Sequence, residues 1–309
     1  MLRYLAISLA LLSAPHSASA VEVYSYASQV NDVDSVNSHW FETTEGVVLV
    51  DVQRLLPEAE RMIEHLRATT SGNVTHIIIT HAHTDHYGGL PVVMTAFPEA
   101  QIITDETTLR SIREDGRGFI AMRNERHGER FPPQEALTAA VADAHTIADG
   151  DVLEVGGERL AFSVLAASEA EATVMVDVLD TDVAFIGDLI NIGAPAVPFE
   201  SIVEWLHQLD VIEERFDACE RLYQGHGPAP TNVAAIPDQR RFLRVMEHLT
   251  RSATEDAVLT KPEEGEIVFA LEAKWPFLQG VAGATRRDVL GFAVRRVAQE
   301  FGATVQSSN

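Results

Sequence analysis

The sequence predicts an α/β protein in which two β-sheets are covered by outer helices, followed by a C-terminal helical extension. Short segments rich in Val and Ile alternate with amphipathic helical patterns along the first part of the chain. After Pro230 the patterns are mainly helical and few strands are expected. Mixed elements of this kind are typical of layered architectures with one or two buried sheets. A chain of 309 residues with 46% hydrophobic content can bury the core of one large domain, or of one domain with an appendage.

The expected strands are short apolar runs bounded by Gly or Asp turns. In chain order they are Val21–Ser25, Gly46–Asp51, Val74–Thr80, Gln101–Thr104, Val152–Val155, Arg159–Leu165, Thr173–Val178 and Val183–Gly187. The expected helices carry apolar residues at helical spacing. They are Leu55–Thr69, which Gly72 follows as a stop, and then Phe199–Phe216, Arg240–Arg251, Glu263–Trp275 and Ala284–Phe301.

Residues 110–135 form an Arg-rich segment, with glycines and prolines, that interrupts this alternation. Such an insertion could close over a site as a lid. A solvated surface loop explains the same composition equally well.

The first twenty residues have the three parts of a secretory signal peptide. Arg3 gives the positive start, Leu5–Leu12 the apolar run, and Ala18-Ser19-Ala20 a small-residue cleavage site. The apolar run is too short to span a bilayer, and no later run is long enough, so we expect no stable membrane insertion. The mature protein is expected to be periplasmic or secreted.

The chain is strongly acidic, with 46 acidic and 23 basic residues and a net charge of −23. This balance argues against nucleic acid as a partner, because phosphate binding needs a basic surface. Lys261 and Lys274 are the only lysines. Cys219 is the only cysteine, so no intramolecular disulfide can form.

A metal-binding pattern follows the apolar run that ends at Ile79. The segment Thr80-His81-Ala82-His83-Thr84-Asp85-His86 places four metal-capable side chains, His81, His83, Asp85 and His86, in one loop. A loop that leaves a buried strand can direct several ligands to one point, whereas a helix presents only residues three or four apart on one face. Neutral imidazoles and a carboxylate are ligands that Zn²⁺ accepts.

Three further segments place polar side chains at strand ends. The apolar run Val47–Val50 ends in Asp51, and the run Ala184–Ile186 ends in Gly187-Asp188. In Gly225-His226-Gly227 a histidine stands between glycines, which allow a tight turn and a close backbone approach.

Together, and in this order, these segments resemble the metallo-β-lactamase fold superfamily of metallohydrolases, which includes glyoxalase II, lactamases and lactonases. The resemblance covers roughly residues 22–232, and its specific parts are the HxHxDH and Gly-His-Gly segments. It implies a four-layered αββα sandwich of two mixed β-sheets. The chain is then divided into a signal peptide (1–20), an αββα domain (21–232) and a helical extension (233–309).

The resemblance also implies two zinc ions per chain. Carried over by position, His81 and His83 hold the first metal, Asp85, His86 and His226 hold the second, and Asp188 bridges them. Asp51 matches an acid that supports the metal-binding loop. The implied reaction is hydrolysis of a small molecule at an ester, lactone, thioester or amide bond, including a β-lactam, by a metal-bound hydroxide. Asp85 is the implied catalytic residue, which orients the hydroxide and passes its proton to the leaving group.

The sequence departs from the family pattern at the third histidine. Counting back from Gly187 to the place where the family has that histidine reaches Glu169, and no histidine lies nearby. Either Glu169 or Glu171 supplies an oxygen ligand instead, or the first metal has only two protein ligands. A non-catalytic or mononuclear metal-stabilised binding protein of the same fold is therefore the alternative function. His39 and Trp40 are candidates for substrate contact, and the oligomeric state is not predicted.

Overall fold

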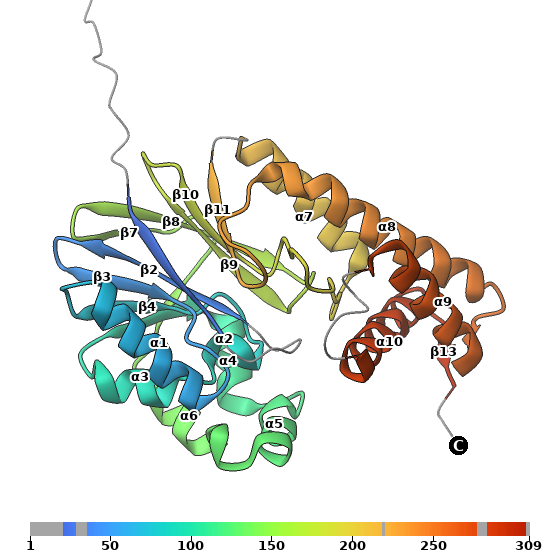
Figure 1. Cartoon of the computed structure of the whole chain (residues 1–309), viewed down its shortest axis with the longest axis horizontal. Helices are drawn as coiled ribbons and strands as arrows, with labels where there is room; N and C mark the ends of the chain where they lie inside the picture. Colours follow the sequence, from blue (N-terminus) through green and yellow to red (C-terminus); the bar gives the residue numbers. More distant parts are fainter. Residues whose placement is uncertain (1–20, 29–35, 218–219, 277–282, 307–309) are drawn as a thin grey trace, which may run out of the picture.

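The computed structural model describes residues 21–28, 36–217, 220–276 and 283–306. The expected signal peptide and Cys219 lie outside these residues. The described chain contains two mixed β-sheets with helices on their outer faces, which confirms the expected αββα class (Figure 1).

The first sheet has six strands in the same spatial order as in the sequence. They are β1 (Val23–Ala27), β2 (Asn37–Thr43), β3 (Gly46–Val50), β4 (Val74–Ile78), β5 (Gln101–Asp105) and β6 (His145–Ile147). β1 to β3 are antiparallel neighbours, and β3 to β6 run parallel.

The second sheet has five strands in the spatial order β11-β10-β9-β8-β7. Their bounds are β7 (Val152–Val155), β8 (Glu158–Ala166), β9 (Ala172–Val178), β10 (Val183–Gly187) and β11 (Arg221–Gln224). Neighbours from β7 to β10 are antiparallel, whereas β10 and β11 are parallel.

Helices on the outer face of the first sheet are α1 (Leu56–Thr69), α3 (Leu90–Ala96), α4 (Glu106–Glu114), α5 (Phe119–His127) and α6 (Gln134–Ala140), with the short α2 (Thr84–Tyr87) near the sheet edge. The second sheet carries α7 (Ile202–Arg215) and the C-terminal helices α8 (Ile236–Ala253), α9 (Lys261–Lys274) and α10 (Gly283–Glu300). The minor elements are η1 (Gly128–Arg130), η2 (Val233–Ala235), β12 (Val258–Leu259) and β13 (Thr304–Val305).

The four layers follow from strands that are apolar on both faces. In β3, Val47 and Leu49 pack against the outer helices, whereas Val48 and Val50 belong to the core between the sheets. In β10, Phe185 lies between the sheets and Ile186 packs towards α7. Because side chains alternate along a strand, a continuous apolar run fills two cores at once.

The C-terminal helices share one hydrophobic core with α7 and the outer face of the second sheet. The Glu300 carboxylate at the end of α10 accepts hydrogen bonds from Ser201 Oγ (2.7 Å) and Ile202 N (2.9 Å), so it caps the first turn of α7. The domain boundary at residue 232 stays a prediction.

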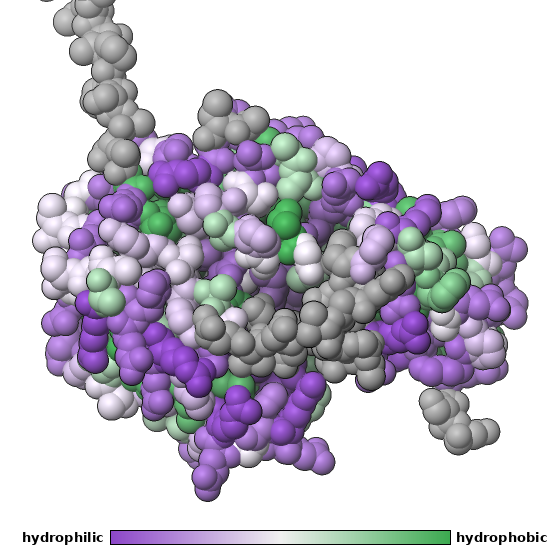
Figure 2. All heavy atoms as spheres, viewed as in Figure 1, coloured by the Kyte–Doolittle hydropathy of each residue, from purple (hydrophilic) through white to green (hydrophobic). Residues whose placement is uncertain are grey.

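Two strands of the first sheet were not expected from the sequence. β2 contains the polar residues Asn37, Ser38 and His39, which hide its strand pattern, and β6 has only three residues. Among the described residues, no helix combines the length and apolarity needed to cross a membrane. On the face shown in Figure 2, hydrophilic residues cover most of the surface, as the acidic composition leads one to expect.

Candidate metal centre

The predicted ligands meet where the two sheets touch at one edge. Because β3 and β4 are parallel, Asp51 and the segment 80–86 emerge at the same end of the first sheet. Because β10 and β11 are parallel, Asp188 and His226 emerge together from the second sheet. The backbone of Val174 donates to the Thr80 carbonyl (2.7 Å), which joins the sheets at this edge.

The first cluster consists of His81, His83, Glu169 and Asp188, each of which offers a ligand atom within 4.8 Å of the others. His83 Nδ1 lies 2.9 Å from Glu169 Oε1 and 3.1 Å from His81 Nε2. His81 Nε2 lies 3.4 Å from Glu169 Oε2. The spacing is that of donors arranged around one point.

The second cluster consists of Asp85, His86 and His226, again with ligand atoms within 4.8 Å of one another. Asp85 Oδ2 lies 3.4 Å from His226 Nε2 and 3.8 Å from His86 Nε2. Asp188 Oδ2 connects the two clusters, since it lies 3.0 Å from His226 Nε2 and 3.8 Å from His81 Nε2. The structure thus brings together all six of the residues that the sequence assigned to metal.

The alternatives for the missing histidine have different surroundings. Glu169 is buried and faces the two histidines of the first cluster. Glu171 instead accepts hydrogen bonds from Ser111 Oγ (2.6 Å) and Arg117 Nε (3.0 Å), away from both clusters. Of the two, Glu169 is therefore the residue placed to complete the first cluster.

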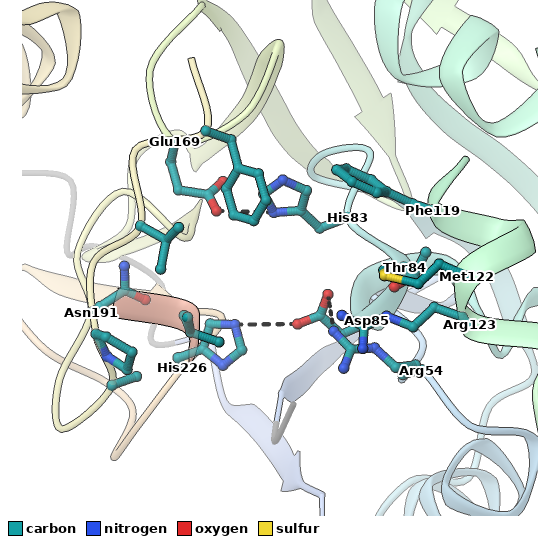
Figure 3. Close-up of a pocket in the computed structure, with 15 residues that line it drawn as sticks. Arg54, His83, Thr84, Asp85, Phe119, Met122, Arg123, Glu169, Asn191 and His226 are labelled. Carbon is teal, nitrogen blue, oxygen red and sulfur yellow. Dashed lines mark ion pairs between the residues drawn. The ribbon is translucent and has the colours of Figure 1, made fainter. Parts of the chain in front are cut away.

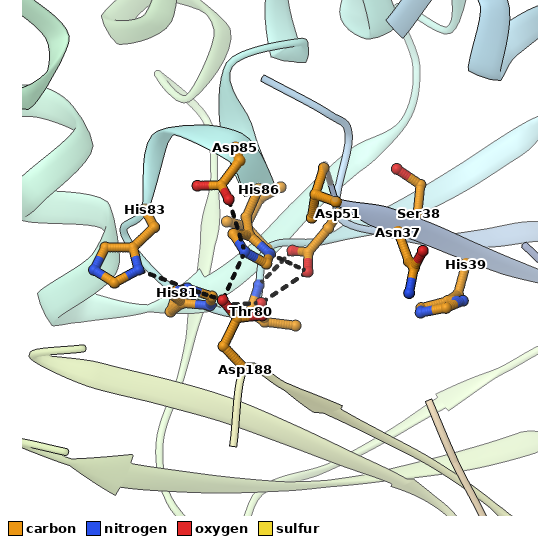
Figure 4. A network of polar contacts seen from close by, with 12 residues as sticks. Asn37, Ser38, His39, Asp51, Thr80, His81, His83, Asp85, His86 and Asp188 are labelled. Atoms are coloured by element: carbon orange, nitrogen blue, oxygen red, sulfur yellow. Dashed lines mark hydrogen bonds and ion pairs between the residues drawn. The ribbon is translucent and has the colours of Figure 1, made fainter. Parts of the chain in front are cut away.

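Asp51 supports the candidate ligands through hydrogen bonds and does not itself belong to either cluster (Figure 4). Its carboxylate accepts hydrogen bonds from Thr80 N (2.9 Å), Thr80 Oγ1 (2.8 Å) and His86 Nδ1 (2.7 Å). The Thr80 hydroxyl in turn accepts from His81 Nδ1 (3.0 Å). Both histidines consequently direct Nε2 at the centre, with their tautomers fixed by the residues behind them.

The imidazole and carboxylate groups of the two clusters are suited to binding cations. His86 Nε2, Glu169 Oε2 and Asp188 Oδ1 are buried and have no hydrogen-bond partner within the described part of the chain. The residues Asp51, Asp85, Glu169 and Asp188 are each at most 5% exposed. Several buried carboxylates this close together are costly unless positive charge lies among them.

Without a metal, protons supply part of that positive charge. Although burial alone would lower it, the charge of Asp188 and a hydrogen bond to it raise the pKa of His226 to about 10. Burial, together with the Asp188 charge, raises the pKa of Glu169 well above its usual range. Metal binding at these residues would therefore release protons.

Two glycines of the second sheet allow its backbone to lie close to the residues of the candidate metal centre. A Cβ atom at Gly225 would overlap Asp188 Oδ1 and lie 2.7 Å from His86 Cε1. Gly187, directly before Asp188, has a φ of +52°, a backbone conformation that residues with a Cβ atom rarely adopt.

Arg54 belongs to the centre although the sequence did not indicate it. Its guanidinium lies 2.9 Å from Asp85 Oδ1, and both side chains are less than 10% exposed. Burial opposes ionisation of Asp85, but the Arg54 charge, assisted by the two neighbouring histidines, holds the pKa of this carboxyl well below its usual range. Arg54 thereby fixes one oxygen of Asp85 and leaves the other facing the second cluster.

A pocket of about 740 Å³, part of it open to solvent, leads to both clusters (Figure 3). One side carries polar residues of the centre, among them Asp85, Glu169 and His226. The rest is largely apolar and is lined by Phe119, Met122, Ala194, Pro195, Val197, Phe199 and Val289. The segment 110–135 therefore contributes a wall of the pocket through α5.

His39 and Trp40 do not contact the pocket, so that expectation is wrong. Both side chains are buried, at 2% and 0% exposure. His39 Nε2 donates to the Gln224 carbonyl (3.0 Å), and Trp40 Nε1 donates to Thr69 Oγ1 (3.2 Å). Figure 4 shows His39 apart from the histidines of the centre.

Comparison with known proteins agrees with this geometry. The sequence matches the profile of the metallo-beta-lactamase superfamily over residues 31–226, which is well over half of the chain. The chain belongs to the metallo-beta-lactamase superfamily. The predicted family membership is thus confirmed.

Individual relatives are distant. The chain is 22% identical over 230 residues to the lactamase-like protein ptaB of Pestalotiopsis fici, and it spans 62% of that protein's length. A metallo-beta-lactamase family protein from Thermus thermophilus has a TM-score of 0.62 at 20% identity, covering 90% of this chain and 92% of the other. A beta-lactamase domain protein from Burkholderia ambifaria has a TM-score of 0.65 at 14% identity, covering 90% and 85%. At such identities the structural likeness establishes the fold alone.

Proposed function

We propose that this metallo-beta-lactamase superfamily protein is a zinc-dependent hydrolase that cleaves an ester, lactone, thioester or amide bond, including a β-lactam, in a small molecule. The observation that carries the proposal is the pair of clusters beside an open pocket. In each cluster the potential ligand atoms lie within 4.8 Å of one another. Imidazole and carboxylate donors in this mixture suit zinc.

His81, His83 and Glu169 would hold one ion, Asp85, His86 and His226 the other, and Asp188 would lie between them. When bound, the ions would lower the pKa of a coordinated water towards neutrality and polarise the bond to be cleaved. We assign Asp85 the orientation of the attacking water and the transfer of its proton to the leaving group, because Arg54 keeps it ionised and turns Oδ2 inward.

A non-catalytic or mononuclear metal-binding protein is the second candidate. It is motivated by the missing third histidine, which leaves two imidazoles in the first cluster. The buried position of Glu169 favours two metals over one, since it supplies a third protein ligand. We also propose export to the periplasm or beyond, on the basis of the signal-like first twenty residues.

The test is metal stoichiometry combined with turnover. Residues 21–309, purified without chelator and equilibrated in micromolar zinc, should contain about two zinc ions per chain by elemental mass spectrometry. The same sample should hydrolyse at least one member of a panel of activated esters, thioesters, lactones and β-lactams. A chelator should abolish that turnover.

Glu169→Gln should reduce the stoichiometry to about one, and Glu171→Gln is the matched control, expected to keep two. One zinc per wild-type chain with no turnover across the panel would establish the second candidate instead. Turnover that survives complete zinc removal would contradict both the zinc-dependent hydrolase and the second candidate function.

A further inference from the structure

The pocket beside the candidate metal centre is lined in part by apolar side chains. We define the apolar wall as Phe119, Met122, Val197, Phe199 and Val289. These residues come from α5, from the loop before α7 and from α10, three parts of the chain that are distant in sequence. The polar side of the pocket, with metal-ligand candidates such as His83, adjoins this wall, so a molecule in the pocket would contact both (Figure 3).

The apolar wall is held in place by packing and hydrogen bonds. The Phe199 ring centroid lies 4.3 Å from that of His83, 6.0 Å from that of Phe119 and 5.0 Å from that of Phe292. Arg296 Nε donates to the Phe199 carbonyl (2.8 Å) and fixes the backbone as well. Because Phe119 and Phe199 are held in this way before a ligand binds, little ordering of these two side chains would oppose binding of an apolar group.

The two arginines that line the pocket already have partners within the protein. Arg54 is paired with Asp85, and Arg123 also has partners within the protein. The partner of Arg54, Asp85, lines the same pocket. A ligand carboxylate would therefore find no cation without a partner among these two arginines.

We propose that the apolar wall binds the hydrocarbon part of the substrate, so that the enzyme selects esters or thioesters with a hydrophobic group of several carbons. This inference rests on the proposed hydrolase function, whose bond class it narrows. Burial of each methylene group in the pocket would raise kcat/KM by up to about fourfold.

The experiment uses the zinc-loaded protein and two substrate series. 4-Nitrophenyl esters from acetate to octanoate lengthen the acyl side, and S-alkyl thioacetates from ethyl to octyl lengthen the leaving group. The series in which kcat/KM rises with chain length shows whether the acyl group or the leaving group contacts the apolar wall. We expect kcat/KM in that series to rise by more than about 100-fold from shortest to longest.

Two glutamate substitutions at exposed helical positions are compared. Met122→Glu, at a side chain 43% exposed on α5, should reduce the ratio of long-chain to short-chain kcat/KM at least tenfold. Phe269→Glu, at a side chain 68% exposed on α9 and outside the pocket, should leave the ratio unchanged. Phe119→Ala should reduce the ratio as well and replaces Met122→Glu if that variant fails to fold.

Binding of acetohydroxamate and octanohydroxamate, measured by calorimetry, reports on the wall independently of turnover. If acetyl esters are hydrolysed but kcat/KM does not rise with chain length in either series, this inference is overturned and the proposed function stays intact. Absence of turnover together with tighter octanohydroxamate binding that Met122→Glu abolishes would support the apolar site and overturn ester hydrolysis. Equal binding of both hydroxamates would overturn the apolar site.

Discussion

Replacement of Arg54 by methionine should destabilise the metal-free protein strongly, because it leaves the Asp85 carboxylate buried without its partner. The pair is separated by 2.9 Å and is 6% and 7% exposed. At an effective dielectric constant of 20, two unit charges at that distance attract by about 6 kcal/mol, part of which desolvation offsets. Removing one partner of such a buried pair costs about 3–5 kcal/mol.

Thermal unfolding in the presence of a chelator measures this cost. About 3–5 kcal/mol corresponds to a fall in Tm of roughly 5–8 °C for a chain of this size. Arg159→Met is the matched control, because the Arg159–Asp180 pair is 52% and 72% exposed and should contribute at most about 1 kcal/mol. Arg54→Met combined with Asp85→Asn should recover part of the loss, since the unpaired charge is then gone.

Zinc adds the decisive comparison. If Asp85 is a zinc ligand, a bound cation replaces the missing positive charge, and the Tm difference between Arg54→Met and the wild type should shrink. Equal Tm losses for Arg54→Met and Arg159→Met would refute the reasoning about burial. A Tm difference that zinc leaves unchanged would refute the assignment of Asp85 to the second metal.

Three further outcomes are expected. Gly225→Ala should lower zinc stoichiometry by elemental analysis, because the added Cβ would lie 2.7 Å from His86 Cε1, whereas Gly265→Ala, where nothing lies within 4 Å, should not. Asp51→Asn should weaken zinc binding about 10–100-fold in a chelator competition, because His86 Nδ1 loses its charged acceptor; unchanged affinity would show that this support is dispensable. Burial lowers the pKa of His39 to about 4 from 6.5, so its stabilising contribution is complete above pH 6.5 and is lost as the pH falls towards 4. The shift amounts to about 3 kcal/mol at most, and His39→Gln should flatten the fall of Tm over that pH range; an unaltered slope would contradict the assignment to His39.

The layered fold was predictable because its strands are apolar on both faces and its helices are regularly amphipathic. β10 illustrates this, since Val183–Gly187 was expected as a strand and is one. β2 was missed because its polar residues are satisfied inside the protein, as His39 is by Ser25 and Gln224. A buried polar residue with tertiary partners looks like a surface residue in the sequence, so no local pattern reveals it.

Most residues of the two candidate metal clusters could be predicted for a related reason. His81, His83 and His86 lie within six residues of one another, so the sequence itself shows them together, although His86 lies on the short helix α2 and not in a loop as expected. Arg54 and Phe199 give no such signal, because each acts through a residue that only the fold brings near. The choice between Glu169 and Glu171 also needed the fold, since the two side chains differ in direction and not in chemistry.

The C-terminal extension and the candidate centre are physically linked by a short chain of contacts. Arg296 on α10 binds the Phe199 carbonyl, and Phe199 packs against the His83 ring. The backbone NH of Phe199 donates to the Glu169 carbonyl (3.3 Å), so the same loop holds the residue that stands in place of the family's third histidine. A carboxylate on a loop is a less rigid donor than a histidine held by a strand end, and it depends more on what packs behind it. Here that support comes from α10, so the helical extension contributes to the first cluster even though it supplies none of its ligands.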